Sequence, residues 1–170
     1  RVTMAKGLAG GFPLSAVTGR AEVVDAPPVG GIGGTYAGNP LAVAAANAML
    51  DIIEDEGLCA NAAKIGSNIK ARLTAVSKRQ GMEAIGDVRG LGAMIAFELV
   101  KDRETREPDA ALTAAIVAQS EQRGLIILPC GTRSNVIRLL PPLNTSDALV
   151  DEALDVLETS IEAAITQTQS

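Results

Sequence analysis

Lys6 combines a nucleophilic side chain with an open setting in the sequence. It follows the short apolar segment 2–5, which is typical of a strand, and glycines come at positions 7, 10 and 11. A lysine at a strand end with so little bulk around it can present its amine to a carbonyl group. Partial desolvation favours the unprotonated amine, which is the form that attacks an aldehyde. The pattern indicates a Schiff-base lysine, and the alternative is a solvated surface lysine.

The glycine-rich segment 30–34 is the second candidate, because glycines expose backbone N–H groups. Thr35 follows it directly, and Asn39 comes where a helix is expected to begin. The amides, the threonine hydroxyl and the helix N-terminus could together hold a phosphate group. The segment has no Gly-Lys-Ser/Thr and is therefore not a nucleotide P-loop. The alternative is a flexible connector.

Arg138 is the third candidate, since it interrupts the apolar segment 136–140. A buried guanidinium needs an anionic partner, because an unpaired buried charge costs several kcal/mol. That partner could be an internal Asp or Glu, or a substrate carboxylate bound by two guanidinium nitrogens. An edge-strand arginine that faces water remains the alternative.

Arg89 and Tyr36 suggest supporting roles. Arg89 lies between Val88 and Gly90, which predicts a turn arginine that supports the fold, and Tyr36 is a possible pocket wall beside Thr35. The three main candidates supply an amine, a phosphate site and a carboxylate site. Pyridoxal-phosphate chemistry on an amino acid requires this combination.

In the first part of the chain, helices and short strands must position these residues. Segment 14–17 predicts a second strand, and 20–26 predicts one or two helical turns. Asn39 and Pro40 have the order of an N-cap and a first-turn proline, which predicts a helix that ends near Gly57. Segment 58–79 predicts the next helix, because its apolar residues recur on one face.

In the second part, short strands alternate with helices. Segment 87–92 predicts a turn before a strand over 93–100, and a charged loop follows over 101–107. Asp109 predicts the cap of a helix that Gly124 ends, and Thr145 or Ser146 predicts the cap of the last helix. With strands over 125–128 and 136–140, this order predicts an α+β unit, an antiparallel sheet with helices on one face.

Composition excludes several classes of function. The chain of 170 residues has a net charge of −5 with no basic stripe, which argues against nucleic-acid and anionic-membrane partners. It contains no histidine, so imidazole catalysis and ordinary zinc sites are excluded, and no metal site is expected. Its two cysteines, Cys59 and Cys130, predict reduced thiols and a cytoplasmic location, although one disulfide remains an alternative.

Four segments, in order along the chain, resemble class III pyridoxal-phosphate aminotransferases. The first, 4–20, contains Lys6 and is similar to the segment of the family that carries the cofactor lysine. The others are 33–42, 86–94 and 136–138. Within the family, the resemblance is nearest to enzymes that act on 4-aminobutyrate.

The resemblance implies a role for each candidate. Lys6 would form the Schiff base with pyridoxal 5′-phosphate and then transfer a proton during catalysis. Thr35 would hold the cofactor phosphate across a dimer interface, in the site of the partner subunit. Arg138 would bind the α-carboxylate of a 2-oxo acid such as 2-oxoglutarate. A homodimer or a dimer of dimers is implied for the full-length enzyme.

The implied reaction transfers the amino group of an ω-amino acid, 4-aminobutyrate, to 2-oxoglutarate, giving succinate semialdehyde and glutamate. One alternative is a related donor, namely 5-aminovalerate, ornithine or a polyamine-derived amine. The other is a non-catalytic fragment that serves only in assembly.

The resemblance also implies a fold of type I, in which an α/β domain binds the cofactor and a small α+β domain follows. We expect residues 1–57 to be the trailing part of the large domain, 58–80 a connecting helix and 81–170 the small domain. Family enzymes are considerably longer, and the segments that bind the pyridine ring have no counterpart here. We therefore expect the chain to be the C-terminal portion of such an enzyme and inactive alone.

Overall fold

The computed structural model describes residues 1–31 and 33–168, and the chain divides between Leu58 and Cys59 into two compact units. Ile32 of the predicted phosphate loop lies outside the described residues, as do the last two residues of the predicted 81–170 domain. The division into a large-domain part, a connecting helix and a small domain stays a prediction. The two units are described separately.

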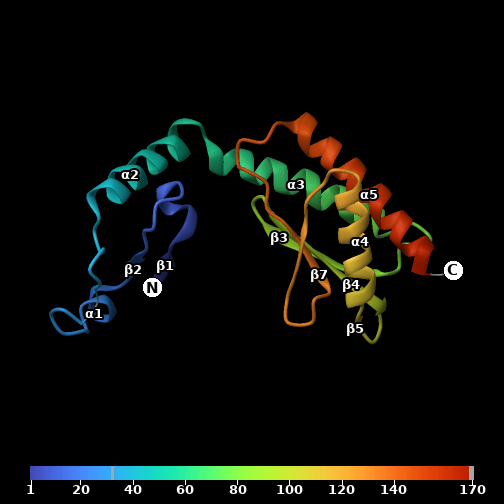
Figure 1. Ribbon diagram of the computed structural model, residues 1–170, viewed down its shortest axis with the longest axis horizontal. Coiled ribbons are helices and arrows are strands. Elements are labelled where there is room, and N and C mark those ends of the chain that lie inside the picture. Colours follow the sequence, from blue (N-terminus) through green and yellow to red (C-terminus); the bar gives the residue numbers. More distant parts are fainter. Residues whose placement is uncertain (32, 169–170) are drawn as a thin grey trace. The chain divides into compact units, whose positions relative to one another are not determined.

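The first unit contains a two-stranded antiparallel sheet. Strand β1 (Val2–Met4) pairs with β2 (Ala16–Thr18), so that Val2 lies opposite Thr18 and Met4 opposite Ala16 (Figure 1). The 3-10 helix η1 (Lys6–Ala9) follows β1, and the short helix α1 (Ala21–Val24) follows β2. The two predicted strands therefore pair with each other, and the second starts two residues later than predicted.

Helix α2 (Pro40–Asp55) begins where the sequence predicts it. The Asn39 side chain accepts hydrogen bonds from the N–H groups of Leu41 and Ala42 at 2.9 and 3.3 Å. These bonds satisfy two of the backbone donors that every helix leaves free at its N-terminus. Gly57 follows the helix with φ of +61°, as a glycine after a helix end often does.

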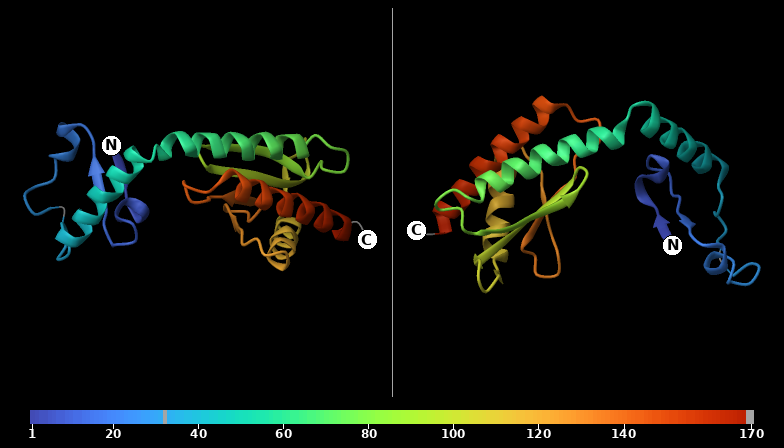
Figure 2. Two further views of the ribbon diagram at one scale, coloured as in Figure 1. Left: turned by 90° about the horizontal axis from the view of Figure 1, so that it is seen from above. Right: turned by 180° about the vertical axis from the view of Figure 1, so that it is seen from behind.

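The second unit is built on an antiparallel sheet whose strands differ in length and follow the order β3–β4–β7–β6. Its strands are β3 (Ile85–Leu91), β4 (Met94–Asp102), β7 (Val136–Leu139) and β6 (Leu128–Cys130), and the short β5 (Glu107–Pro108) also pairs with β4. The helices of this unit are α3 (Leu58–Val76), α4 (Ala110–Gln122) and α5 (Asp147–Thr168) (Figure 2). The predicted antiparallel α+β unit is confirmed.

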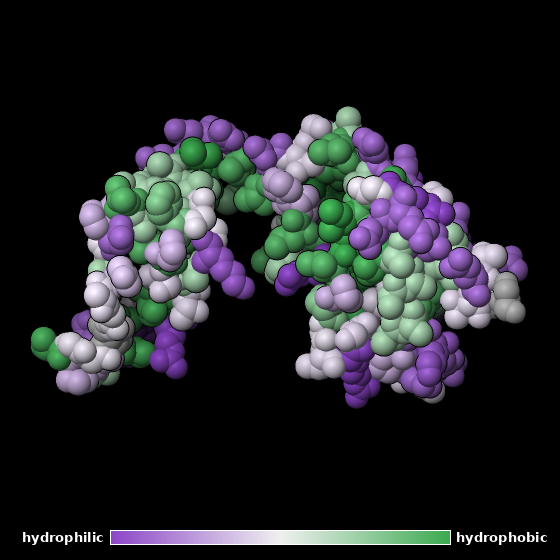
Figure 3. Space-filling view, viewed as in Figure 1, coloured by the Kyte–Doolittle hydropathy of each residue, from purple (hydrophilic) through white to green (hydrophobic). Residues whose placement is uncertain are grey.

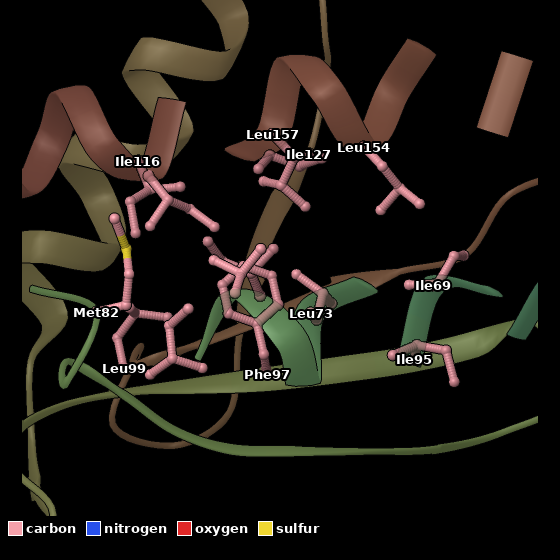
Figure 4. Packing of buried hydrophobic residues seen from close by; sticks show 14 of the residues in the cluster. Ile69, Leu73, Met82, Ile95, Phe97, Leu99, Ile116, Ile127, Leu154 and Leu157 are labelled. Carbon is pink, nitrogen blue, oxygen red and sulfur yellow. The ribbon is translucent and has the colours of Figure 1, made fainter. Parts of the chain in front are cut away.

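One face of this sheet is packed and the other is open. Ile95, Phe97 and Leu99 alternate along β4 and are buried, whereas Ala96 and Glu98 between them are only partly buried. Figure 4 shows the three buried side chains directed toward residues of α3, α4 and α5. Because successive strand residues point to opposite faces, Met94, Ala96 and Glu98 lie on the face without helices.

Three of the predicted boundaries in this unit are wrong. The strand predicted over 125–128 is instead β6, which begins at Leu128 and extends to Cys130. Segment 87–92, predicted as a turn, lies mostly within β3, because its backbone pairs with β4 from Ile85 to Leu91. The loop predicted over 101–107 is shorter, since β4 continues to Asp102. In segments 87–92 and 101–102 the cross-strand hydrogen bonds outweigh the local glycine and charge signals.

Polar contacts join α3 to α5, and the two helices run side by side in the same direction. Arg72 donates to Asp155 at 2.5 Å and to Glu158 at 2.9 Å, and Arg79 also donates to Glu158. Burial raises the pKa of Glu158, but the hydrogen bonds from Arg79 and Arg72 outweigh it and hold the pKa below its usual value. The contacts fix the register of the two helices over the sheet.

Helix α3 approaches the turn between β3 and β4 so closely that only glycine fits at position 66. A Cβ on Gly66 would lie 1.8 Å from the carbonyl oxygen of Gly92. We expect Gly66→Ala to lower the free energy of unfolding by about 2 kcal/mol, although alanine improves helix propensity by about 1 kcal/mol. Denaturant titration measures this change. The exposed neighbour Ser67→Ala is the control, and a Gly66→Ala protein more stable than the wild type would contradict the prediction.

Candidate functional site

Lys6 has a strained backbone conformation. It is the first residue of η1, its φ is +59°, and its side chain is exposed. A left-handed conformation costs a residue with a Cβ about 1–2 kcal/mol, and such strain clusters at functional sites. Within the described residues the Lys6 amine has no hydrogen-bond or ion-pair partner. Lys6 therefore lies at a defined turn, and its amine is unpaired among the described residues.

The turn at Lys6 is produced by the residues around it. Ala5 is extended, and its carbonyl oxygen accepts a hydrogen bond from the N–H of Leu8 at 3.4 Å. Gly10 closes η1 in the left-handed conformation, and a Cβ there would lie 3.3 Å from the sulfur of Met49 in α2. Ala9 is fully buried. The glycine signal of the sequence thus corresponds to a tight turn packed against α2.

The glycine-rich loop offers free hydrogen-bond donors. Residues 34–39 at its end form two turns, in which the N–H of Ala37 donates to the Gly34 carbonyl at 2.9 Å and that of Asn39 to the Tyr36 carbonyl at 3.2 Å. In the described part of the chain, the N–H groups of Gly34, Thr35 and Tyr36 have no acceptor. Three successive donors and the exposed Thr35 hydroxyl are the groups that a phosphate accepts from.

Among the described residues, no contact explains the glycines at 33 and 34. A Cβ on either residue would have no atom within 4 Å, and neither residue has a positive φ. The absence of side chains there leaves the loop backbone open to a group from outside this chain. Tyr36 is 83% exposed in this unit, so the predicted pocket wall faces no pocket within it.

Arg138 lies in the middle of β7 on the open face of the sheet. It is opposite Ala96 of β4 on one side and Leu128 of β6 on the other. Its side chain is exposed, and no carboxylate or carbonyl among the described residues pairs with it. Of the alternatives open from sequence, an internal Asp or Glu partner is thereby excluded for the described residues. A free guanidinium on an apolar strand is suited to bind a carboxylate from outside.

An apolar cavity of about 590 Å³ lies beside Arg138. Most residues that line the cavity are apolar, and they come mainly from the segments before β6 and after β7 and from α5. Arg138 is one of the few polar residues in the lining. Ile126 at its edge is 84% exposed. Figure 3 shows apolar side chains gathered over these segments. The cation therefore lies at the border of an apolar surface, where a charge-assisted hydrogen bond is less screened by water.

Arg89 occupies the same open face, in β3 rather than in the predicted turn. Its guanidinium donates to Asp87 at 2.7 Å and to Glu98 of β4 at 2.8 Å. The hydrogen bonds to Asp87 and to Glu98 raise the pKa of Arg89 further above its usual value. Sequence reasoning did not single out these two acids. The signal that could have identified Glu98 is its charge within the otherwise apolar segment 93–100.

The three predicted site residues fall in different units. Lys6 and Thr35 lie in the first unit and Arg138 lies in the second, and no hydrogen bond among the described residues joins Lys6 to Thr35. Their roles in catalysis stay predictions. Both cysteines are free thiols, and none of the described helices is long and apolar enough to cross a membrane.

Known proteins identify the family. Residues 2–161 match the family described as Aminotransferase class-III, which is most of the chain. The chain belongs to the class III aminotransferases. Members of this family use pyridoxal phosphate, and the chain has the mixed helix and sheet structure of a partial fold-type I domain. The expected family and fold are confirmed.

Three relatives illustrate the similarity. The chain is 49% identical over 162 residues to the 4-aminobutyrate aminotransferase of Escherichia coli K12, covering 95% of the chain and 38% of that protein. It is 47% identical over 156 residues to a 5-aminovalerate aminotransferase of Pseudomonas putida, covering 92% of the chain and 36% of that protein. The solved structure of ornithine aminotransferase from Toxoplasma gondii matches with a TM-score of 0.84 and 30% identity, over 99% of the chain and 38% of that structure. The chain thus spans less than two fifths of each of these relatives.

Two groups of residues in this class III aminotransferase chain suit the chemical groups of pyridoxal phosphate, the family cofactor. A free amine at a strained turn suits an aldehyde, and the unpaired donors at Gly34, Thr35 and Tyr36 suit a phosphate ester. The Lys6 amine would hold the cofactor in the site of its own subunit, and the Thr35 hydroxyl would hold the cofactor phosphate in the site of the partner subunit. The described residues also contain no group of side chains that could bind a metal ion.

Proposed function

We propose that this chain is part of an enzyme that transfers the amino group of 4-aminobutyrate to 2-oxoglutarate. The products are succinate semialdehyde and glutamate. The observation that carries the proposal is the identity of about half of all aligned residues to proteins named 4-aminobutyrate aminotransferases. This identity extends over 95% of the chain in the Escherichia coli relative and 92% in that of Mycobacterium tuberculosis.

Lys6 carries the central chemistry in this proposal. When bound, pyridoxal phosphate supplies an aldehyde for the amino group and an electron sink for the carbon that loses a proton. Lys6 Nζ binds the cofactor at rest. During turnover the same nitrogen takes the proton from the carbon that bears the substrate amino group and returns it at a second position. The unpaired, exposed amine supports this role.

Thr35 and the loop around it bind the phosphate of the cofactor. The hydroxyl and the free N–H groups donate hydrogen bonds to phosphate oxygens, which fixes the position of the reactive aldehyde. In our proposal this loop serves the site of the partner subunit in a homodimer. The open space at Gly33 and Gly34 supports an approach from outside the chain.

Arg138 binds the α-carboxylate of 2-oxoglutarate. The planar guanidinium can donate two parallel hydrogen bonds to one carboxylate, which sets the orientation of the 2-oxo acid as well as its affinity. Its free state and its apolar surroundings support this role.

A second donor deserves a test beside 4-aminobutyrate. The relative from Pseudomonas putida, named a 5-aminovalerate aminotransferase, is 47% identical, close to the values of the 4-aminobutyrate relatives. 5-Aminovalerate is one methylene longer, and one methylene in an apolar pocket changes kcat/KM by about 10- to 200-fold. The two donors are therefore readily separated by kinetics.

The test is the steady-state specificity of the full-length enzyme. We expect kcat/KM for 4-aminobutyrate to exceed that for 5-aminovalerate and for ornithine by about tenfold or more with 2-oxoglutarate as acceptor. Coupled formation of glutamate measures the turnover. A higher kcat/KM for 5-aminovalerate would replace the donor in the proposal, and absence of turnover with all three donors would contradict the proposed function.

A further inference from the structure

Two carboxylates lie opposite each other on the open face of the sheet. Asp87 of β3 pairs in register with Glu98 of β4. Like charges at directly opposed positions destabilise a sheet. Arg89 lies between them in space and donates from separate nitrogens, at 2.7 Å to Asp87 and at 2.8 Å to Glu98. One guanidinium thus binds both acids at once, which a lysine ammonium does less well.

Glu98 is also a close neighbour of Arg138. In the pairing of β4 with β7, Ala96 lies opposite Arg138 and Glu98 lies opposite Val136, so Glu98 and Arg138 are diagonal neighbours on one face. Diagonal neighbours in a sheet are about 7–8 Å apart, which long side chains span. The small Ala96 places no bulk beside them. Even so, Glu98 binds Arg89, and Arg138 has no partner among the described residues.

We propose that Arg89 is a positioning residue that holds Glu98 away from Arg138 and so keeps the Arg138 guanidinium open for the substrate carboxylate. The inference rests on the proposed role of Arg138 in binding the 2-oxo acid. Arg89 itself does not contact the substrate. Its function is to remove an intramolecular competitor.

The charges of the neighbouring residues explain why Glu98 must be held away from Arg138. Glu98 is half-buried, with 29% of its side chain exposed, so its carboxylate gains more from an ion pair than a fully solvated one does. Without Arg89, Glu98 still has Arg138 as its diagonal neighbour on β7, and the carboxylate of Asp87 on the opposite side repels that of Glu98. A tethered carboxylate on Arg138 would then have to be displaced by each 2-oxo acid that binds.

The test compares Arg89→Met, Glu98→Gln and the double variant in the full-length enzyme. We expect Arg89→Met to raise the KM for 2-oxoglutarate about fivefold, since an exposed ion pair contributes up to about 1 kcal/mol. The Kd of glutarate, an unreactive dicarboxylate measured by calorimetry, should rise by a similar factor. The double variant should return both values to within about twofold of the wild type, because its neutral amide no longer competes for Arg138. Glu98→Gln alone should leave them unchanged.

Two further measurements separate this role from a loss of structure. The half-reaction with 4-aminobutyrate should keep its rate in all variants, since it does not use the proposed contact, and melting curves should show folded protein. Should Arg89→Met fail to fold, two further variants replace it: Arg89→Lys retains one cation and Arg89→Gln retains none. The KM of Arg89→Lys is then expected between those of the wild type and Arg89→Gln. Unchanged KM and Kd in Arg89→Met, or a double variant as impaired as Arg89→Met, would overturn the inference. Loss of turnover in the wild type would instead contradict the proposed function.

Discussion

Replacing Lys6 with alanine in the full-length enzyme is expected to lower kcat by about 10³-fold or more. The amine is proposed both to bind the cofactor and to transfer the proton, and positioned proton transfer alone contributes about 10²- to 10⁴-fold. No other lysine or histidine can replace it within the first unit, because Lys6 is the only lysine before position 58 and the chain contains no histidine. Single-turnover reaction with 4-aminobutyrate measures the loss directly.

Two control variants separate chemistry from stability. Lys70→Ala removes an exposed lysine that has no partner among the described residues, and it should keep wild-type activity. Lys6→Gly should be as inactive as Lys6→Ala but equally or more stable, since glycine adopts φ of +59° without the strain of about 1–2 kcal/mol. A fully active Lys6→Ala protein would contradict the catalytic role and favour the alternative of a non-catalytic assembly module.

Replacing Arg138 with alanine is expected to raise the KM for 2-oxoglutarate about 100-fold. Loss of one partner of a hydrogen-bonded charge pair costs roughly 2–5 kcal/mol, and the apolar surface beside Arg138 places it in that range. Arg138→Lys should fall between alanine and the wild type, because an ammonium does not form the two parallel hydrogen bonds. The second half-reaction, followed as glutamate formation, measures both variants.

The stability of the fold should change little in Arg138→Ala, because the side chain is exposed and makes no ion pair with the described residues. Arg133 in the turn between β6 and β7 is a matched control: it is also exposed and unpaired in the described chain, and Arg133→Ala should leave the KM unchanged. Equal effects of the two substitutions would show that general positive charge, not Arg138, attracts the 2-oxo acid.

Local signals in the sequence predict much of the secondary structure. Asn39 and Asp109 are both N-caps in the structure, each accepting a hydrogen bond from an N–H in the first turn. Helix periodicity likewise predicts the buried face of α3, where Ile65, Ile69 and Leu73 are all buried. These predictions succeed because the interactions that decide them lie within four residues along the chain.

Predictions that depend on distant partners were less successful. Arg89 was interpreted as a turn residue, because the glycines at 90 and 92 are strong local signals, but strand pairing with β4 keeps it inside β3. The state of Arg138 was open between an internal partner and an external one for the same reason. Whether an arginine is paired depends on strand register, which no local pattern specifies.

The family, the residue types available for catalysis and the positions of the main helices can all be predicted from the sequence. Composition is read directly from the sequence, and helix caps and apolar periodicity depend on residues close together in it. The order of the motifs along the chain was sufficient for the family resemblance. Three facts become visible in the folded chain alone: Lys6 has a strained backbone, Gly66 lies against the backbone of Gly92, and Arg89 rather than Arg138 binds Glu98. Each of these facts depends on which segments meet in space. Strand register and helix packing determine which segments are in contact, and both arise from interactions between residues far apart in the chain.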